Sequence, residues 1–230
     1  MKTKYLFLFA ALFFLSNSSE AQWSFGIKGT SYSSTYSSGL NPFQKGDPEK
    51  VKGLGVSVQL YRRISQHFSF GVEPGVAQRG AINPFYNTCF GFCGTGADFS
   101  TFPYNSASIY SNYVQLPFFA QYKTALLKSK LELFGKAGAG ISYAVSAYQQ
   151  SDLIYRYQSI GSDIEPIKFE ETDGFKRWDA GLHAGVGIGW RFCFGVVSLE
   201  TEVYQGLANL HIIGFKNRTR GVSLGYRLDL

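Results

Sequence analysis

The chain has 230 residues, which is enough for one domain of ordinary size. Charged residues make up only 17% of it, aromatic residues another 17%, and 26 residues are glycine, a mixture that is unusual for a soluble cytosolic enzyme. A mean hydropathy of −0.07 excludes a protein with several membrane-spanning helices, and the 22 basic residues form no block that would favour nucleic-acid binding.

The N-terminal residues have the features of a secretory signal peptide. A basic start precedes an apolar stretch, residues 5–15, and the small residues Ser19 and Ala21 fit a cleavage site. We therefore expect residues 1–21 to be a signal peptide and residues 22–230 to form one mature domain. The apolar stretch is too short to remain as a membrane-spanning helix. No cysteine directly follows the cleavage site, so a lipid anchor is not expected.

Residues 131–145 introduce the pattern that recurs along the mature chain. Their odd-numbered positions are uncharged and mostly apolar, whereas the even-numbered positions include Glu132, Lys136 and several small residues. A period of two is typical of a β-strand with two different faces. A helix is disfavoured because it would place both charges on the face of Leu133 and Gly140, leaving no apolar stripe.

The same alternation predicts eight strands in all. In chain order they occupy residues 23–30, 52–61, 68–79, 113–123, 131–145, 176–190, 196–207 and 221–230. These lengths suit tilted strands, which need about 9–11 residues to cross a bilayer. The connections alternate in length, and the long ones are residues 31–50, 80–110 and 147–175. This rhythm predicts an all-β fold, an eight-stranded antiparallel up-and-down transmembrane β-barrel with both termini at the short-turn, periplasmic side.

The composition of the two faces indicates which one lines the barrel. One face is bulky and free of charge through the middle of each strand, while the other holds glycine, serine, alanine and the charges. Small residues suit a narrow interior, and a basic side chain at a lipid-facing midplane position costs about 2–4 kcal/mol. The apolar face is therefore expected to contact lipid. The alternative, a secreted soluble barrel that binds an apolar ligand, would reverse the two faces.

Aromatic residues near the strand ends are expected to form interfacial girdles. The girdle residues are Trp23, Phe68, Tyr122, Trp190, Phe192 and Tyr226 at the periplasmic side, and Tyr143 and Trp178 at the outside. Pro74 and Pro117 fall within strands and are expected at bulges, because proline cannot donate to the hydrogen-bond ladder.

The charges on the small-residue face are expected to point into the lumen. They are Lys28, Glu73, Arg79, Lys123, Glu132, Lys136, Arg177, Asp179, Glu200, Glu202 and Arg227. Buried charges need partners, and acids and bases are nearly equal in number, so we expect them to pair. An eight-stranded barrel is only just wide enough for its side chains, so the paired charges would plug it. A proton or ion path through the same residues is the alternative.

The C-terminus and the whole mature chain resemble outer-membrane barrels. Ser223, Gly225, Leu228 and Leu230 resemble the signal that barrel-assembly machinery recognises, with Leu230 in place of the usual terminal aromatic residue. The Ala-Gln junction after the signal peptide, the strand at 113–118 and the glycine-rich strand at 181–189 are similar to those of small PorT-like and OmpA- or OmpX-like barrels. A PorT-like member implies an accessory role in protein secretion, and an OmpX-like member implies surface interaction or structural support.

The remaining residues with chemical potential are few. Cys89 and Cys93 lie in a long connection and are close enough in sequence to form a disulfide, which leaves Cys193 over near a short turn. An enzyme that adds or removes acyl chains on lipid A would need a histidine beside a serine and an acid at the outer rim. Only His211 is expected there, with no suitable neighbour in sequence.

The sequence therefore predicts a non-enzymatic outer-membrane protein with a structural or interaction role. We expect no cofactor, no metal and no nucleic-acid partner. The expected partners are outer-membrane lipid and lipopolysaccharide, the barrel-assembly machinery during biogenesis, and other envelope proteins. The long connections are rich in tyrosine, serine, glycine and asparagine, which suit adaptable contact surfaces.

Overall fold

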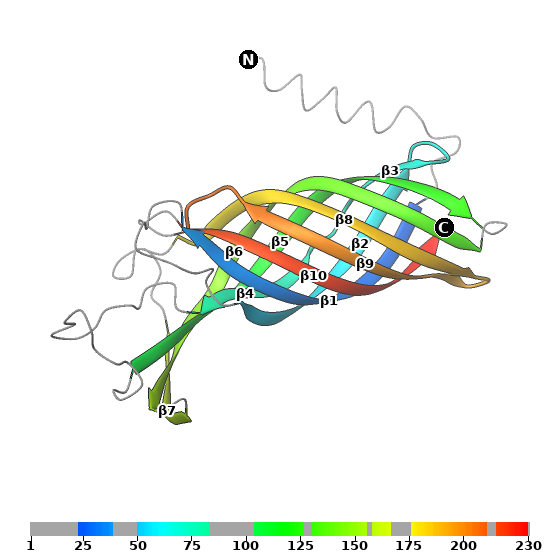
Figure 1. Cartoon of the computed structure of the whole chain (residues 1–230). Helices are drawn as coiled ribbons and strands as arrows, with labels where there is room; N and C mark the ends of the chain where they lie inside the picture. The colour runs from blue at the N-terminus through cyan, green and yellow to red at the C-terminus, as the bar shows by residue number, and fades with distance from the viewer. Residues whose placement is uncertain are drawn as a thin grey trace, which may run out of the picture.

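The computed structural model describes residues 23–38, 50–82, 104–126, 130–155, 158–166, 176–210 and 215–229. These residues form ten β-strands of one antiparallel sheet, which is rolled into an elongated barrel (Figure 1). The strands are β1 (Trp23–Ser38), β2 (Val51–Arg63), β3 (Phe68–Val72), β4 (Gly75–Ile82), β5 (Tyr104–Leu126), β6 (Leu131–Tyr155), β7 (Gln158–Pro166), β8 (Trp178–Phe192), β9 (Gly195–Gly206) and β10 (Phe215–Asp229). Within these ranges, no helix is long and apolar enough to cross a membrane.

Hydrogen bonding closes the sheet into a ring. β1 pairs with β2 on one side and with β10 on the other, so the first and last strands meet. The ring continues through β9, β8, β6 and β5. β3 and β4 together occupy one place between β2 and β5. The ring therefore has eight strands, which confirms the predicted fold class, and β7 pairs with β6 beyond the ring.

The two ends of the barrel differ in their connections. Residues 64–67 join β2 to β3, and residues 193–194 join β8 to β9. Both turns lie at the end where β1 starts and β10 finishes, since Ser24 is opposite Tyr61 on β2 and Asp229 on β10 (Figure 1). We call this the turn end and the opposite one the loop end.

Exposure alternates along the strands with the predicted parity. Side chains of β2 alternate between buried and exposed from Val51 to Tyr61. Large apolar side chains stand on the outer surface, where Leu54 is 72% exposed and Val186 is 61% exposed. Near the loop end of this surface, Tyr143 packs edge-on against Trp178 with ring centres 4.9 Å apart. The outer surface is thus an apolar band with aromatic side chains near its border.

Several strands extend beyond their predicted bounds at the loop end. β1 continues to Ser38, β5 begins at Tyr104, and β6 continues to Tyr155, so parts of the predicted long connections are strand. β7 was also expected to be loop. In residues 31–38 both faces carry hydroxyl side chains, tyrosine and serine inward and serine and threonine outward, because the outward face there does not have to contact hydrocarbon. A period of two is then invisible in the sequence, although the backbone still pairs.

The expectation of bulges at the two strand prolines is wrong. Pro74 lies in a gap between β3 and β4, but the pairing with β2 keeps one register on both sides of the gap. Pro117 keeps its register with β6 and accepts a hydrogen bond from the Glu73 amide at 3.1 Å. The bulge lies instead at Val145, since Tyr113 is opposite Ala144 and Asn112 is opposite Ser146. The hydrogen-bond ladder can therefore lack the N–H donor of a proline without an extra residue in the strand.

A charge placed on the apolar band should destabilise the barrel in lipid. We expect Val186→Arg to lower the free energy of unfolding by about 2–4 kcal/mol, because position 186 faces outward in the middle of β8. Urea unfolding in phospholipid vesicles, followed by tryptophan fluorescence, measures this. Gln205→Arg, an outward position near the loop end of β9, is the control and should cost at most about 1 kcal/mol. Equal costs for the two variants would contradict a lipid-facing band.

The exposed cysteine in the β8–β9 turn can report the orientation of the barrel. Cys193 is a free, exposed thiol at the turn end. In a Cys89→Ser/Cys93→Ser background, a membrane-impermeant maleimide should label Cys193 only after the outer membrane is permeabilised. Asp163→Cys, at an exposed position of β7, should be labelled in intact cells when Cys193 is replaced by serine. Labelling of Cys193 in intact cells would show that the turn end faces the outside, which is the reverse of the expected orientation.

Candidate functional site: charged clusters inside the barrel

Five charged side chains meet in the middle of the barrel. Lys28 comes from β1, Glu73 from the gap between β3 and β4, Lys136 from β6, and Glu200 and Glu202 from β9. All five are buried, with exposed fractions between 1% for Glu73 and 8% for Glu202. Strand parity explains their position, because each occupies an inward-facing place on its strand. We call these five residues the central network.

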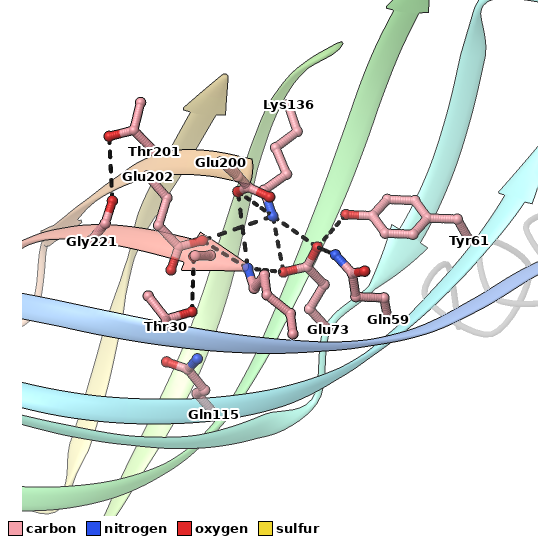
Figure 2. Close-up of polar contacts among 12 residues, drawn as sticks. Thr30, Gln59, Tyr61, Glu73, Gln115, Lys136, Glu200, Thr201, Glu202 and Gly221 are labelled. Carbon is pink, nitrogen blue, oxygen red and sulfur yellow. Dashed lines mark hydrogen bonds and ion pairs between the residues drawn. The ribbon is translucent and has the colours of Figure 1, made fainter. Parts of the chain in front are cut away.

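Glu73 links the two lysines of the central network, and Figure 2 shows its contact with Lys136. Its Oε2 lies 2.6 Å from Lys28 Nζ and its Oε1 lies 2.8 Å from Lys136 Nζ. Glu73 also accepts hydrogen bonds from the Gln59 amide at 3.1 Å and from the Tyr61 hydroxyl at 2.6 Å. A single carboxylate therefore has four neighbours donating to it, which offsets the cost of burying its charge.

The two glutamates of β9 complete the central network from the opposite wall. Lys136 Nζ lies 2.7 Å from Glu200 Oε1, and Lys28 Nζ lies 2.8 Å from Glu202 Oε2. Further contacts of 3.8–3.9 Å run from Lys28 to Glu200 and from Lys136 to Glu202. Each lysine thus contacts all three carboxylates. Three acids around two ammonium groups give the network a formal excess of one negative charge.

Glycines of β8 make room for this network. A Cβ at Gly185 would lie 2.8 Å from Glu200 Oε1 and 3.3 Å from Lys136 Cε. A Cβ at Gly189 would lie 2.8 Å from Glu132 Cγ. The glycine-rich stretch of β8 therefore accommodates charged side chains from its neighbours on β6 and β9.

A second group of charges lies at the turn end. Glu132 of β6 pairs with Arg227 of β10, and its other oxygen lies 3.2 Å from Arg191 Nη2. Asp229 lies 3.1 Å from both Arg191 and Arg227. We call these four residues the turn-end cluster. Arg191 and Asp229 were not among the predicted lumen charges, although they continue the inward parity of Gly189 and Arg227.

A third group lies toward the loop end. Arg79 of β4 donates to Gln115, and its Nη1 lies 3.9 Å from Asp179 Oδ2. The Arg79 guanidinium carbon stands 4.1 Å from the centre of the Tyr204 ring. Asn217 donates to Asp179 at 2.7 Å. These five residues form the loop-end cluster, in which the tyrosine, glutamine and asparagine have no charge that the sequence could have revealed.

Two predicted lumen charges are not members of these clusters, although Lys123 lies close enough to the turn-end cluster to interact electrostatically with Arg227, Asp229 and Glu132. Lys123 is buried, 6% exposed, on β5 near the turn end. Arg177 is only half-buried and lies just before β8 begins. Its guanidinium carbon is 5.8 Å from the ring centre of Tyr143, which belongs to the outward parity of β6. The parity of β8 does not extend to Arg177, so the structure places it at the outer border rather than in the lumen.

The histidines are placed in unrelated surroundings. His183 is buried in the lumen, with its ring centre 4.6 Å from that of Tyr204 and 5.5 Å from that of Phe119. His67 lies at the turn end, where its Nδ1 is 3.0 Å from the Lys123 carbonyl oxygen. His211 lies outside the described residues. Across the described ranges, no group of three potential metal ligands occurs.

The other predicted site residues are only partly described. Ser223 faces inward with its hydroxyl 2.9 Å from that of Thr30, Gly225 is also buried, and Leu228 is exposed on the outer surface. Leu230 lies outside the described residues. So do Cys89 and Cys93, whose predicted disulfide therefore stays a prediction.

A closed antiparallel ring with an apolar outer band and charges inside defines a class, the outer-membrane β-barrels. The chain belongs to the family described as outer membrane protein beta-barrel domain, whose model matches residues 9–211. This confirms the predicted family and the predicted location in the outer membrane.

Solved structures of similar fold come from several bacteria. Neisserial surface protein A is 13% identical, with 90% of this chain and 97% of that chain covered and a TM-score of 0.45. OprG from Pseudomonas aeruginosa is 11% identical, with 92% and 98% covered and a TM-score of 0.45. Ail from Yersinia pestis, solved with a heparin analogue, is 13% identical, with 91% and 99% covered and a TM-score of 0.40. A search of curated proteins found no match.

Removing one lysine of the central network should destabilise the barrel. Lys136→Met would leave three buried carboxylates facing Lys28 alone, so we expect the free energy of unfolding to fall by about 3–5 kcal/mol. Adding Glu200→Gln should restore part of this loss, because it lowers the excess negative charge of the variant network from two to one. Urea unfolding in vesicles measures both variants.

The control for this series is a lysine at the surface. Lys130→Met replaces an exposed side chain at the turn end and should change the free energy of unfolding by less than about 0.5 kcal/mol. If Lys136→Met is as stable as Lys130→Met, the central network does not stabilise the fold.

Proposed function

We propose that this chain is a non-enzymatic barrel with a closed lumen, which acts in the outer membrane through structural support or through interactions at its loop end. The observation that carries the proposal is the central network. Its five side chains come from four places around the ring and meet at distances of 2.6–2.8 Å. An open water-filled path would separate such groups.

Packing on either side of the central network supports a closed lumen. The turn-end cluster joins β6, β8 and β10 across one level of the barrel. At the loop-end side, a small space beside Arg79, His183 and Glu202 has a volume of about 10 Å³, room for about one water molecule. An ion moving through would have to break several buried, hydrogen-bonded ion pairs, each of which is costly to separate.

The loop end is the natural place for interactions. β5 and β6 run past the ring there, and β7 adds to their sheet (Figure 1). Loops and extensions on a rigid scaffold commonly carry binding functions. We propose that this end contacts other envelope proteins, as an accessory subunit of an envelope or secretion assembly would.

We also propose that the barrel-assembly machinery recognises the C-terminal residues Ser223, Gly225, Leu228 and Leu230.

The surroundings of the two described histidines, His67 and His183, argue against a lipid-modifying enzyme built on either of them. The His183 ring is enclosed by aromatic rings inside the lumen, away from the lipid surface. His67 is at the turn end, whereas acyl chains of the outer leaflet would require a site near the loop end. Neither ring has a described contact with both a serine and an acid, which acyl-transfer chemistry requires.

Electrical recording tests the closed lumen directly. We expect the purified barrel to give no steady conductance in planar bilayers. A Lys28→Ala/Glu73→Ala/Lys136→Ala variant should conduct, because it empties the middle of the lumen. Leu133→Ala/Val186→Ala/Leu199→Ala, which changes only outward side chains, is the matched control and should stay silent. A heat-dependent shift in electrophoretic mobility verifies that each variant is folded. Steady conductance of the unaltered chain would refute the closed lumen.

A further inference from the structure

Three cationic side chains gather on the outer surface of β10, β1 and β2. Arg218 and Arg220 stand two residues apart on the outward face of β10, and Lys52 stands on the outward face of β2. Ser33 of β1 lies between them, since it is opposite Arg220 on one side and opposite Lys52 on the other. Figure 1 shows β1 and β10 running side by side to the loop end. We call the three cations the cationic patch.

The members of the cationic patch are close enough to share one ligand. Alternate residues of a strand are about 7 Å apart, and positions two strands apart are about 10 Å apart. Long arginine and lysine side chains easily span these distances. The hydroxyl groups of Ser33 and of the exposed Ser31 lie within the same surface.

Within the described residues, none of the three cations has an acidic partner. Their side chains are exposed and have no hydrogen bond or ion pair to any part of the chain that the structure describes. The outward positions described on β9, β10, β1 and β2 carry no carboxylate, because Glu200, Glu202 and Asp229 all have the inward parity. The charge of the patch is therefore available to an external anion.

The depth of the patch relates it to the membrane. Ten residues of β1 separate Trp23 at the turn end from Ser33. A rise of about 3.3 Å per residue and a tilt of about 40° place Ser33 about 25 Å from Trp23 along the membrane normal. This equals the height of the apolar band of an outer-membrane barrel, about 25 Å. The patch therefore lies where hydrocarbon ends on the loop-end side.

Directly below the patch the surface is apolar. Val222 is 57% exposed and Leu224 is 64% exposed, and both continue the outward face of β10 toward the turn end. A ligand that fits both regions has an anionic group at the border and hydrocarbon beneath it. That is the structure of a membrane lipid rather than of a soluble anion.

The neighbouring strands β4, β5 and β6 lack this arrangement. There, at the same border, Gln78 donates to Asn112 and to Tyr148 at 3.3 Å, and Asn112 donates to Ser146 at 3.0 Å. These side chains are neutral and satisfy one another. Among the described outward positions, β4, β5 and β6 therefore carry neutral side chains where β10 and β2 carry cations, while Arg177 is a further cation at the border before β8.

We propose that the cationic patch binds the phosphate of a phosphorylated glycolipid in the outer leaflet. Arg218 and Arg220 can each offer paired N–H donors to phosphate oxygens, and Lys52 adds a point charge. The acyl chains of the lipid would lie on Val222 and Leu224. The inference rests on the turn end facing the periplasm, but not on the closed lumen, so an open pore would leave it intact.

Lipid binding to the whole refolded barrel tests the proposal. Lipid A with its phosphates, and the same lipid with its phosphates removed, are titrated into the protein in neutral detergent and counted by native mass spectrometry. The unaltered chain should prefer the phosphorylated lipid. Arg218→Gln/Arg220→Gln should bind it about 25-fold more weakly, at roughly fivefold for each basic side chain near an anionic lipid.

Control experiments distinguish the loss of patch charge from a general loss of charge, from misfolding and from binding of free phosphate. Arg62→Gln/Lys130→Gln removes two charges at the turn end and should leave the affinity unchanged, and Arg218→Lys/Arg220→Lys should retain most of it. Heat-modifiable mobility verifies the fold of each variant. Equal binding of both lipids, or equal loss in the turn-end control, would overturn the proposal. Displacement of the lipid by excess inorganic phosphate would overturn it as well, because the patch would then be a site for free phosphate.

Discussion

The pairing of β1 with β10 is the constraint on which the rest of the structure depends. Hydrocarbon offers no hydrogen-bond partners, so a sheet in a bilayer must have no open edge within the apolar band. The fifteen paired positions from Ser24↔Asp229 to Ser38↔Phe215 remove both edges at once. Closure with eight strands then fixes a narrow interior. Every inward side chain must be accommodated there, which explains why inward positions alternate between glycine, small hydroxyl residues and a few long charged ones.

Closure also determines how the inward charges are satisfied. Without room for bulk water, each buried ion must find its partners across the lumen, on strands that are distant in sequence. Glu73 does so from the gap between β3 and β4, where its own amide donates to the Pro117 carbonyl of β5 in the same register as the flanking strands. The proline that follows has no N–H, so the gap costs few ladder bonds, and the carboxylate is free to meet Lys28 and Lys136. The gap between β3 and β4 therefore accommodates the proline and also positions the Glu73 carboxylate in the central network.

The sequence predicts this barrel well where its two faces meet different environments. Within the apolar band, period-two alternation located all eight ring strands and the parity of Glu132, Lys136 and their counterparts. Beyond the band both faces meet polar surroundings, so the loop-end parts of β1, β5 and β6 and the whole of β7 left no pattern. The extra residue at Val145 was also hidden, because small side chains on either side of it fit both parities.

The ion-pair partners of the inward charges could not be predicted from the sequence, for a different reason. Parity states that a charge points inward, but not at which height, and height depends on the stagger between strands around the ring. The structure accordingly divides one predicted set of lumen charges into three levels. It also adds Arg191, which lies just past a predicted strand end, and Asp229, which lies within the last predicted strand. It moves Arg177 outward, since Arg177 precedes β8.

Charge balance connects the interior with the outer surface. The chain has 22 basic and 16 acidic residues, a net charge of +6. Among the buried side chains, Lys28, Arg79, Lys123, Lys136 and Arg227 are matched by Glu73, Glu132, Asp179, Glu200 and Glu202, five of each sign. The buried side chains that the structure describes therefore contribute nothing to the net charge of +6. A low-dielectric lumen cannot hold a net charge cheaply, whereas a border in contact with water and anionic headgroups stabilises one. The same electrostatic rule that neutralises the inside thus permits unpaired arginines on the outer rim.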